Sequence, residues 1–205
     1  MIIDRNMFDK RDVIRFFDVL APKWDEETGT ENEKIIEMLL DNASVSEGED
    51  ILDVGCGTGR LFHYYLKRNV SSVTGIDISS GMIEIAKKKC PGGKIVLICD
   101  DASDHSFGRC FDRIVVFDAF PHFTDPEKTI ENLSKHLKED GTLTIAHNAS
   151  RDEINRRHGV MRSDVSHVLM DIDELDEVVS KYLKVEIKIS DDRMYQIVGR
   201  KENDL

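Results

Sequence analysis

Residues 50–60 read Asp-Ile-Leu-Asp-Val-Gly-Cys-Gly-Thr-Gly-Arg, and this stretch decides the fold. The apolar run that opens it predicts a short buried strand. Gly55, Gly57 and Gly59 then follow at every second position, a spacing that suits a turn whose backbone passes close to a neighbour or a ligand. Apolar residues within 61–66 have helical spacing. The unit is therefore predicted to be strand, glycine turn and helix, the opening of a nucleotide-binding α/β unit.

Two residues of this stretch indicate which kind of ligand the turn can bind. Arg60 stands where the dinucleotide-binding fingerprint needs a third small residue, which argues against a pyrophosphate site. Asp53 precedes the first glycine and could accept a hydrogen bond from a cationic ligand group. The string from Asp53 to Gly59 resembles motif I of the class I S-adenosylmethionine-dependent methyltransferases, an acidic residue followed by x-Gly-x-Gly-x-Gly. The resemblance implies that S-adenosyl-L-methionine is the cofactor and that it is bound by Asp53, Gly55, Cys56, Gly57 and Gly59.

Composition limits the class of protein. The 205 residues suit one domain, which we expect to span residues 1–205. No run is long and apolar enough for a transmembrane helix, and residues 1–5 lack the layout of a signal peptide. A net charge of −12 repels polyanions. Cys56 and Cys99 are expected to be small buried residues in a reducing compartment. We therefore expect a cytoplasmic protein, monomer or homodimer, with no membrane or nucleic-acid partner.

The N-terminal segment predicts helices ahead of the sheet. Val13, Phe16, Phe17 and Leu20 form a buried helical stripe that Pro22 should end. Residues 17–25 resemble the Phe-Asp-x-x-Ala-x-x-Tyr/Trp-Asp entry segment of ubiquinone-biosynthesis-type and related small-molecule methyltransferases. The resemblance implies that residues 1–45 form a lid in which Trp24 closes over the ligand. The alternative is that Trp24 only packs in a surface groove.

Strands and helices alternate beyond the glycine turn, as a doubly wound fold requires. Further strands are predicted at residues 73–77, 94–99, 111–117, 142–146, 183–189 and 195–199, with a turn at 138–141. Helices are predicted at residues 82–89, 127–137 and 173–182. We expect a Rossmann-like, seven-stranded, mostly parallel sheet with an antiparallel C-terminal strand and helices on both faces.

Acidic residues at strand ends are candidates for cofactor binding. Asp77 ends the second strand, where a carboxylate can bind both ribose hydroxyls, and Ile78 follows it within the second motif of the family. By the same resemblance, Asp101 before Ala102 would recognise adenine, with Asp100 as the alternative. Phe117 ends the fourth strand, and residues 117–123 should border the transferred methyl group.

Histidines are candidates for the acceptor side. His122 and His147 follow the fourth and fifth strands, which are neighbours in this fold, so they should emerge over one crevice and could act as general bases. His122 could instead be a packing residue. Helical spacing puts Arg151, Asn155 and His158 on one face, which is either part of a substrate-side insertion at residues 148–170 or a solvated face. The predicted substrate-side residues are Trp24, Asp118, Asn148, Arg151, Asn155 and His158.

These observations predict a methyltransferase that moves a methyl group to a small-molecule acceptor by in-line displacement. No resident metal is expected. One alternative is a metal-assisted enzyme in which His122, His147 and His158 hold the metal. Another is a non-catalytic S-adenosylmethionine-binding protein. The identity of the acceptor cannot be read from the sequence.

Overall fold

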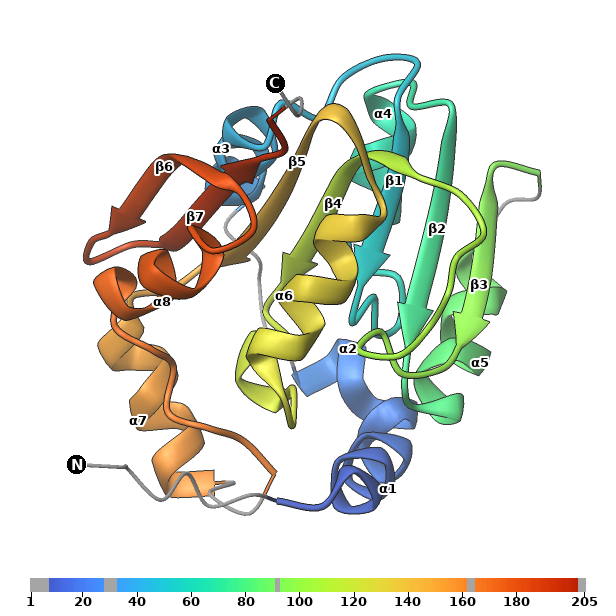
Figure 1. Cartoon of the computed structure of the whole chain (residues 1–205). Coiled ribbons are helices and arrows are strands. Elements are labelled where there is room, and N and C mark those ends of the chain that lie inside the picture. Colours follow the sequence, from blue (N-terminus) through green and yellow to red (C-terminus); the bar gives the residue numbers. More distant parts are fainter. Residues whose placement is uncertain (1–7, 28–32, 91–92, 162–164, 203–205) are drawn as a thin grey trace.

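The computed structural model describes residues 8–27, 33–90, 93–161 and 165–202 (Figure 1). The strands are β1 (Asp50–Val54), β2 (Ser72–Asp77), β3 (Ile95–Cys99), β4 (Phe111–Phe117), β5 (Leu137–His147), β6 (Lys184–Ser190) and β7 (Tyr195–Arg200). The helices are α1 (Lys10–Leu20), α2 (Trp24–Glu27), α3 (Glu33–Asn42), α4 (Phe62–Lys67), α5 (Ser80–Lys89), α6 (Pro126–Lys135), α7 (Arg151–Met161) and α8 (Ile172–Val179). Short 3₁₀ turns span Ala21–Lys23 and Phe120–His122.

The strands form one seven-stranded sheet in the order β3-β2-β1-β4-β5-β7-β6. Pairs among the first five strands are parallel, and β7 runs antiparallel to both β5 and β6. The predicted sheet and its antiparallel C-terminal strand are thereby confirmed. The strand order reverses between β1 and β4, where open α/β sheets place their ligands.

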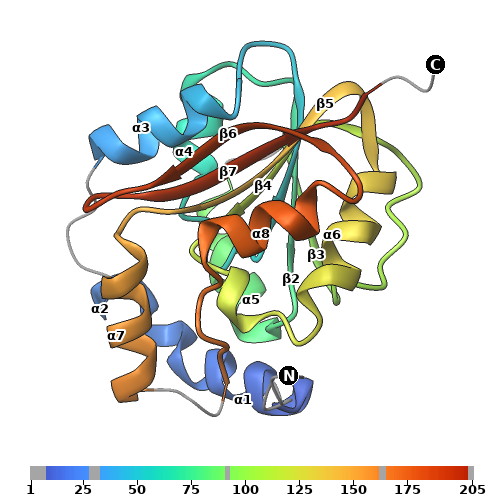
Figure 2. The same ribbon diagram turned by 60° about the vertical axis from the view of Figure 1, so that its left-hand side comes forward.

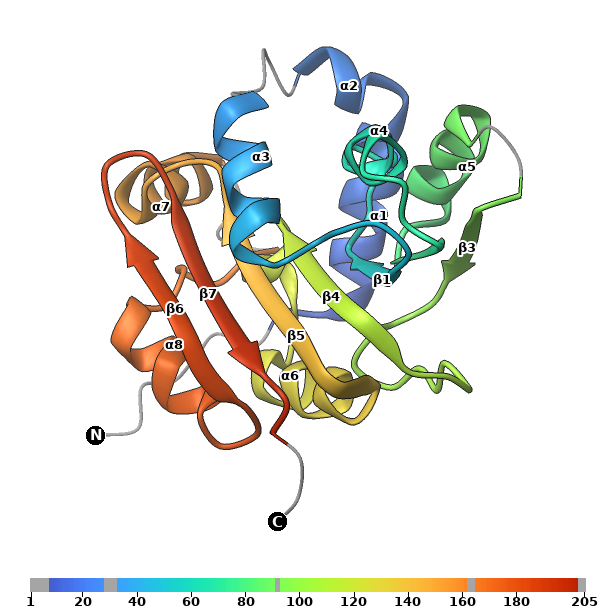
Figure 3. The same ribbon diagram turned by 90° about the horizontal axis from the view of Figure 1, so that it is seen from above.

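Helices cover both faces of the sheet, as predicted (Figures 2 and 3). Side chains alternate along each strand, so Ile51 and Leu52 of β1 enter different cores. On one face, α3, α4 and α5 supply the core around Ile51. On the other face, α6 and α8 pack around Leu52. In the part of the chain that the structure describes, no helix is long and apolar enough to cross a membrane.

Two sequence predictions about local structure were wrong. Residues 138–141 are not a separate turn, because β5 already begins at Leu137 and runs through them. Asp140 takes a left-handed φ of 59°, and Lys138 reaches the carboxylates of Asp50 and Asp112. Leu137 pairs with Phe111 and Thr142 pairs with Arg113, so residues 138–141 form an irregularity within β5 opposite Asp112. Cys99 is exposed rather than buried, because β3 is an edge strand of the sheet.

The glycine turn after β1 is held by main-chain hydrogen bonds. The N–H groups of Gly55 and Cys56 both donate to the carbonyl oxygen of Ile76, at 2.8 and 3.1 Å. Gly55, Gly57 and Gly59 all have positive φ, the conformation that glycine tolerates best. A Cβ atom on Gly55 would lie 2.5 Å from the Cβ of Ala119, whereas one on Gly57 would meet nothing within 4 Å.

This difference yields a matched pair of substitutions. We expect Gly57→Ala to lower the free energy of unfolding by about 1–2 kcal/mol, the cost of a left-handed non-glycine residue. Gly55→Ala adds a clash with the chain after β4 and should cost markedly more. Chemical denaturation of both variants measures the two losses. Equal losses would show that the approach to Ala119 does not constrain the turn.

Candidate functional site

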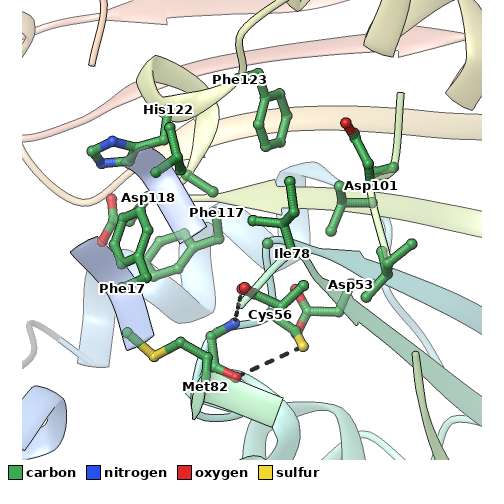
Figure 4. Close-up of a pocket in the computed structure, with 18 of the residues that line it drawn as sticks. Phe17, Asp53, Cys56, Ile78, Met82, Asp101, Phe117, Asp118, His122 and Phe123 are labelled. Carbon is green, nitrogen blue, oxygen red and sulfur yellow. Dashed lines mark hydrogen bonds between the residues drawn. The ribbon is translucent and has the colours of Figure 1, made fainter. Parts of the chain in front are cut away.

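A pocket lies at the carboxyl ends of β1 to β4, beside the glycine turn (Figure 4). Its floor includes Asp53, Cys56 and Asp77, and α1 and α2 add side chains from the opposite side. Further lining residues that the sequence predicted are Trp24, Gly55, Gly57, Ile78, Asp101, Ala102, Phe117, Asp118 and His122. The strand ends therefore bring most of the predicted cofactor residues to one place.

Asp53 is a buried carboxyl group at the bottom of this pocket. It is 2% exposed, and its Oδ2 atom has no hydrogen-bond partner among the described residues. Burial, together with the nearby carboxylate of Asp77, raises the pKa of Asp53 to about 8. A buried acceptor without a donor is costly unless a ligand supplies one. Asp53 is therefore suited to bind a cationic hydrogen-bond donor.

Asp77 holds the glycine turn as well as facing the pocket. Its Oδ2 accepts the N–H of Gly57 at 2.8 Å, and its Oδ1 accepts the N–H of Ser79 at 2.9 Å. Burial raises the pKa of Asp77 to about 6 despite these two bonds. Each carboxylate oxygen has a second lone pair, so binding of ribose hydroxyls by Asp77 stays a compatible prediction.

The motif predicts that Cys56 and Gly59 bind the cofactor, and the structure shows a packing role for each of them. Cys56 is buried, and burial raises the pKa of its thiol, so it lines the pocket as an unreactive apolar group. Gly59 is not among the lining residues of the described pocket. A Cβ atom on Gly59 would lie 2.4 Å from the ring of Phe62, so this glycine lets α4 approach the turn.

Asp100 and Asp101 both line the pocket after β3. Asp101 accepts the N–H of Ser103 at 2.8 Å and forms an ion pair with Lys10 of α1. Asp100 contacts Nδ1 of His105 at 2.8 Å. The side chain of Asp101 is 20% exposed and that of Asp100 is 56% exposed, which keeps Asp101 the better candidate for recognising a ring amine.

Polar contacts fasten α1 and α2 over the pocket. Oδ1 of Asp18 accepts the hydroxyl of Ser79 at 2.6 Å and the N–H of Gly81 at 2.8 Å. Asp25 accepts the hydroxyl of Thr58 at 2.7 Å and pairs with Lys89 at 2.6 Å. Phe17 and Trp24 thereby form part of the pocket wall. Asp18 and Asp25 are the two aspartates of the entry segment at residues 17–25, but the sequence indicated no contact for them. Lys10 was not predicted, because contacts between residues so far apart leave no periodic signal.

His122 faces the pocket as a neutral imidazole. Its Nδ1 lies 2.9 Å from the carbonyl oxygen of Val165, which can only accept, so Nδ1 carries the proton and Nε2 carries the lone pair. Burial lowers the pKa of His122 to about 4, and the neighbouring imidazoles of His147, His158 and His167 act in the same direction. His122 is therefore a hydrogen-bond acceptor at neutral pH and a weak base.

The three predicted histidines lie in one region, but they do not all line the pocket. The rings of His122 and His158 are 5.0 Å apart. His147 is 2% exposed, and its Nδ1 lies 3.2 Å from Oδ1 of Asp118. Among the lining residues of this pocket, His122 is present and His147 and His158 are not. His147 points into the interior because the last residue of β5 packs beside Tyr195, with ring centroids 6.1 Å apart.

Asp118 connects the glycine turn to the end of β5. It has a left-handed φ of 52°, and its Oδ2 lies 3.2 Å from Nη1 of Arg60. Its other oxygen accepts the N–H of Asn148 at 3.3 Å besides contacting His147. The guanidinium of Arg60 also lies over the ring of Phe117, 5.4 Å from its centroid. Arg60 thus belongs to the pocket wall, although the sequence reasoning used it only to exclude a pyrophosphate.

The polar face of α7 holds a neighbouring segment. Nε of Arg151 donates to the carbonyl oxygens of Leu169 and Met170, at 3.0 and 3.1 Å. Oδ1 of Asn155 accepts the N–H of Leu169 at 2.7 Å. In this structure Arg151 and Asn155 therefore shape residues 165–170, which border His122, and neither lines the pocket. Among the residues that the structure places, no group of three or more His, Cys, Asp or Glu could hold a metal.

Comparisons with known proteins agree with this geometry. Residues 51–141 match the family model described as a methyltransferase domain. The malonyl-[acyl-carrier protein] O-methyltransferase of Acetivibrio thermocellus is 32% identical over 143 residues, 68% of this chain and 50% of that protein. The demethylmenaquinone methyltransferase of Thermotoga maritima is 31% identical over 147 residues, 66% of this chain and 61% of that protein. The chain thus spans about half the length of these curated relatives.

Solved structures share the fold at low sequence identity. A Haloferax volcanii methyltransferase in complex with its Trm112 activator has a TM-score of 0.79 and 19% identity, covering 91% of this chain and 98% of that chain. The N-methyltransferase NodS of Bradyrhizobium japonicum, bound to S-adenosyl-L-homocysteine, has a TM-score of 0.74 and 18% identity. The match covers 93% of this chain and 99% of that chain.

The raised pKa of Asp53 predicts how the stability of the folded protein depends on pH. In the unfolded chain this group loses its proton near pH 3.8, whereas in the folded protein it keeps the proton until about pH 8. Unfolding therefore releases a proton between these values, and the free energy of unfolding should fall by up to about 1.4 kcal/mol for each pH unit. Asp53→Asn should remove this decrease, so its melting temperature should exceed that of the wild type increasingly from pH 4 to pH 8.

Thermal denaturation of the ligand-free protein across this pH range measures the effect. Asp192→Asn is a matched control, because the side chain of Asp192 is 93% exposed. A melting-temperature difference between Asp53→Asn and the wild type that does not change with pH would contradict the assignment.

Proposed function

Because the chain belongs to the class I S-adenosylmethionine-dependent methyltransferases, we propose that it transfers a methyl group from S-adenosyl-L-methionine to a small-molecule acceptor. The relatives named above act on a malonyl group carried by a protein and on a quinone precursor, so membership of the family leaves the acceptor open. The likeness to ubiquinone-biosynthesis-type enzymes in residues 17–25 stays a prediction.

The observation that carries the proposal is the buried pair Asp53 and Asp77 at the glycine turn. The unpartnered oxygen of Asp53 fits the ammonium of the cofactor's amino-acid part. The spare lone pairs of Asp77 fit the ribose hydroxyls, and Asp101 with Ala102 fits the adenine ring. When bound, the cofactor supplies a methyl group that its sulfonium has already activated.

The protein's part in catalysis is mainly alignment. The glycine turn and Asp77 fix the floor of the pocket, while hydrogen bonds from Asp18 and Asp25 fasten α1 and α2 beside it. Holding an acceptor in line with the reacting bond can supply on the order of 7 kcal/mol or more of the barrier reduction. His122 lines this pocket, and its Nε2 carries a lone pair because Nδ1 holds the proton. Since its pKa is about 4, His122 orients the acceptor better than it removes a proton.

Calorimetry with S-adenosyl-L-homocysteine tests the cofactor site. At pH 7 the carboxyl of Asp53 is largely protonated, so binding of an ammonium group beside it should release a proton. The binding enthalpy should therefore vary with the ionisation enthalpy of the buffer. Asp53→Asn should weaken binding and abolish the proton release, and Asp77→Ala should weaken binding through lost hydrogen bonds. No binding by the wild type at millimolar ligand would refute the proposed function.

Two measurements test whether α1 and α2 close over the pocket when the cofactor product binds. Trp24 is the single tryptophan of the chain and lines the pocket, so its fluorescence should change when S-adenosyl-L-homocysteine binds. Hydrogen exchange of residues 10–27 should slow at the same time, whereas the hairpin of β6 and β7 should keep its exchange rates. Unchanged exchange in residues 10–27 would leave Trp24 as a packing residue.

A further inference from the structure

The pocket carries more negative than positive side chains. Five aspartates line it, and the four other than the largely protonated Asp53 are charged at pH 7, against two basic residues, Lys10 and Arg60. Both cations already face carboxylates, Lys10 at Asp101 and Arg60 at Asp118. Arg151, which was predicted as a substrate-side residue, donates to main-chain carbonyls and does not line the pocket. An anionic acceptor would therefore enter a pocket of net negative charge and would have to displace an existing ion pair.

The acceptor side of the pocket offers a lone pair and aromatic faces. His122 keeps its proton on Nδ1 for the carbonyl of Val165, so Nε2 accepts a hydrogen bond from an N–H or O–H group. The ring of Phe17 lies 4.9 Å from that of His122 and 5.6 Å from that of Trp24, and all three residues line the pocket. Figure 4 shows His122, Phe17 and Asp118 on one side of the cavity. Aromatic faces and a carboxylate together attract positive charge.

We propose that the methyl acceptor is an amine, whose nitrogen is held by Nε2 of His122 beside Asp118, next to the contacting rings of Phe17 and Trp24. This inference rests on the proposed methyl transfer. It assigns a substrate class to the same pocket and makes His122 a specificity-determining residue.

The chemistry of an amine suits this charge distribution throughout the reaction. The neutral amine attacks, its N–C bond forms while the S–C bond breaks, and the electron pair of the broken bond stays on sulfur. The positive charge therefore moves from sulfur to nitrogen, and the product leaves as an ammonium without a proton being held by the protein. A phenolate or carboxylate acceptor would bring a negative charge that the lining of the pocket repels. The amine keeps an N–H for His122, whose low pKa preserves the lone pair at neutral pH.

Three probes of similar size test the charge preference in the protein saturated with S-adenosyl-L-homocysteine. Benzylamine, benzyl alcohol and phenylacetate differ mainly in the charge and donors of one group. Trp24 fluorescence or NMR titration at pH 8 should show benzylamine binding at least about tenfold more tightly than phenylacetate, with benzyl alcohol between them. Equal or tighter binding of phenylacetate, or no binding of benzylamine at millimolar concentration, would overturn the inference.

Two variants separate the role of His122 from a general effect on the protein. His122→Phe keeps an aromatic ring but removes the accepting nitrogen, so benzylamine affinity should fall about fivefold while the affinity for S-adenosyl-L-homocysteine is retained. His63→Phe, at an exposed position of α4, should change neither. Benzylamine affinity that is unchanged in His122→Phe would overturn the assignment.

Methyl transfer gives a second readout. With methyl-labelled S-adenosyl-L-methionine and pooled small amines, phenols, thiols and carboxylic acids, the label should enter the amine pool. Label in the carboxylic acid or phenol pool would overturn the inference and leave the proposed function intact. Failure of the wild type to bind S-adenosyl-L-homocysteine would instead refute the proposed function itself.

Discussion

The buried carboxyl pair of Asp53 and Asp77 is the constraint on which the site depends. Asp77 fixes the glycine turn by accepting the N–H of Gly57. Burial, together with the nearby charge of Asp77, raises the pKa of Asp53, one oxygen of which has no donor among the described residues. Burying two carboxyl groups together is unfavourable in the ligand-free protein. Under the proposed function, the ammonium of the cofactor would complete this arrangement, and its binding would offset the free energy that burial of the two carboxyl groups costs.

Contacts of Asp118 hold together another wall of the pocket, at the carboxyl end of β4. Asp118, in a left-handed conformation after β4, contacts Arg60 from the glycine turn and His147 from the end of β5. Three neighbouring strands are thereby tied together at their carboxyl ends. Because Asp118 already pairs with Arg60, an anionic group beside His122 would have to displace this ion pair. Under the proposed function, Asp53 and Asp77 would lie in the cofactor part of the pocket and Asp118 in its acceptor part.

The architecture could be predicted because it depends on short-range patterns. The apolar run at residues 51–54, the three glycines and the aspartate at the end of β2 fix the ends of β1 and β2 and the turn between β1 and α4. The orientation of single side chains could not be predicted in the same way. His147 and His122 both come after strand ends, yet packing beside Tyr195 turns His147 inward. The polar residues 138–141 resembled a turn because the carboxylates that pair with Lys138 lie far away in the sequence.

The segment of residues 165–170 is held in place by hydrogen bonds to its main-chain atoms. Arg151 binds the carbonyls of Leu169 and Met170, His122 binds that of Val165, and the N–H of His167 donates to the carbonyl of Pro121. Main-chain atoms are the same in every amino acid, so these polar contacts do not depend on the side chains of the segment. Leu169 and Met170 also bury their side chains in the core, so most of this segment is fixed by packing as well. Val168 is 71% exposed, which makes it the position of the segment where a side chain can change without disturbing the sheet or the cofactor floor.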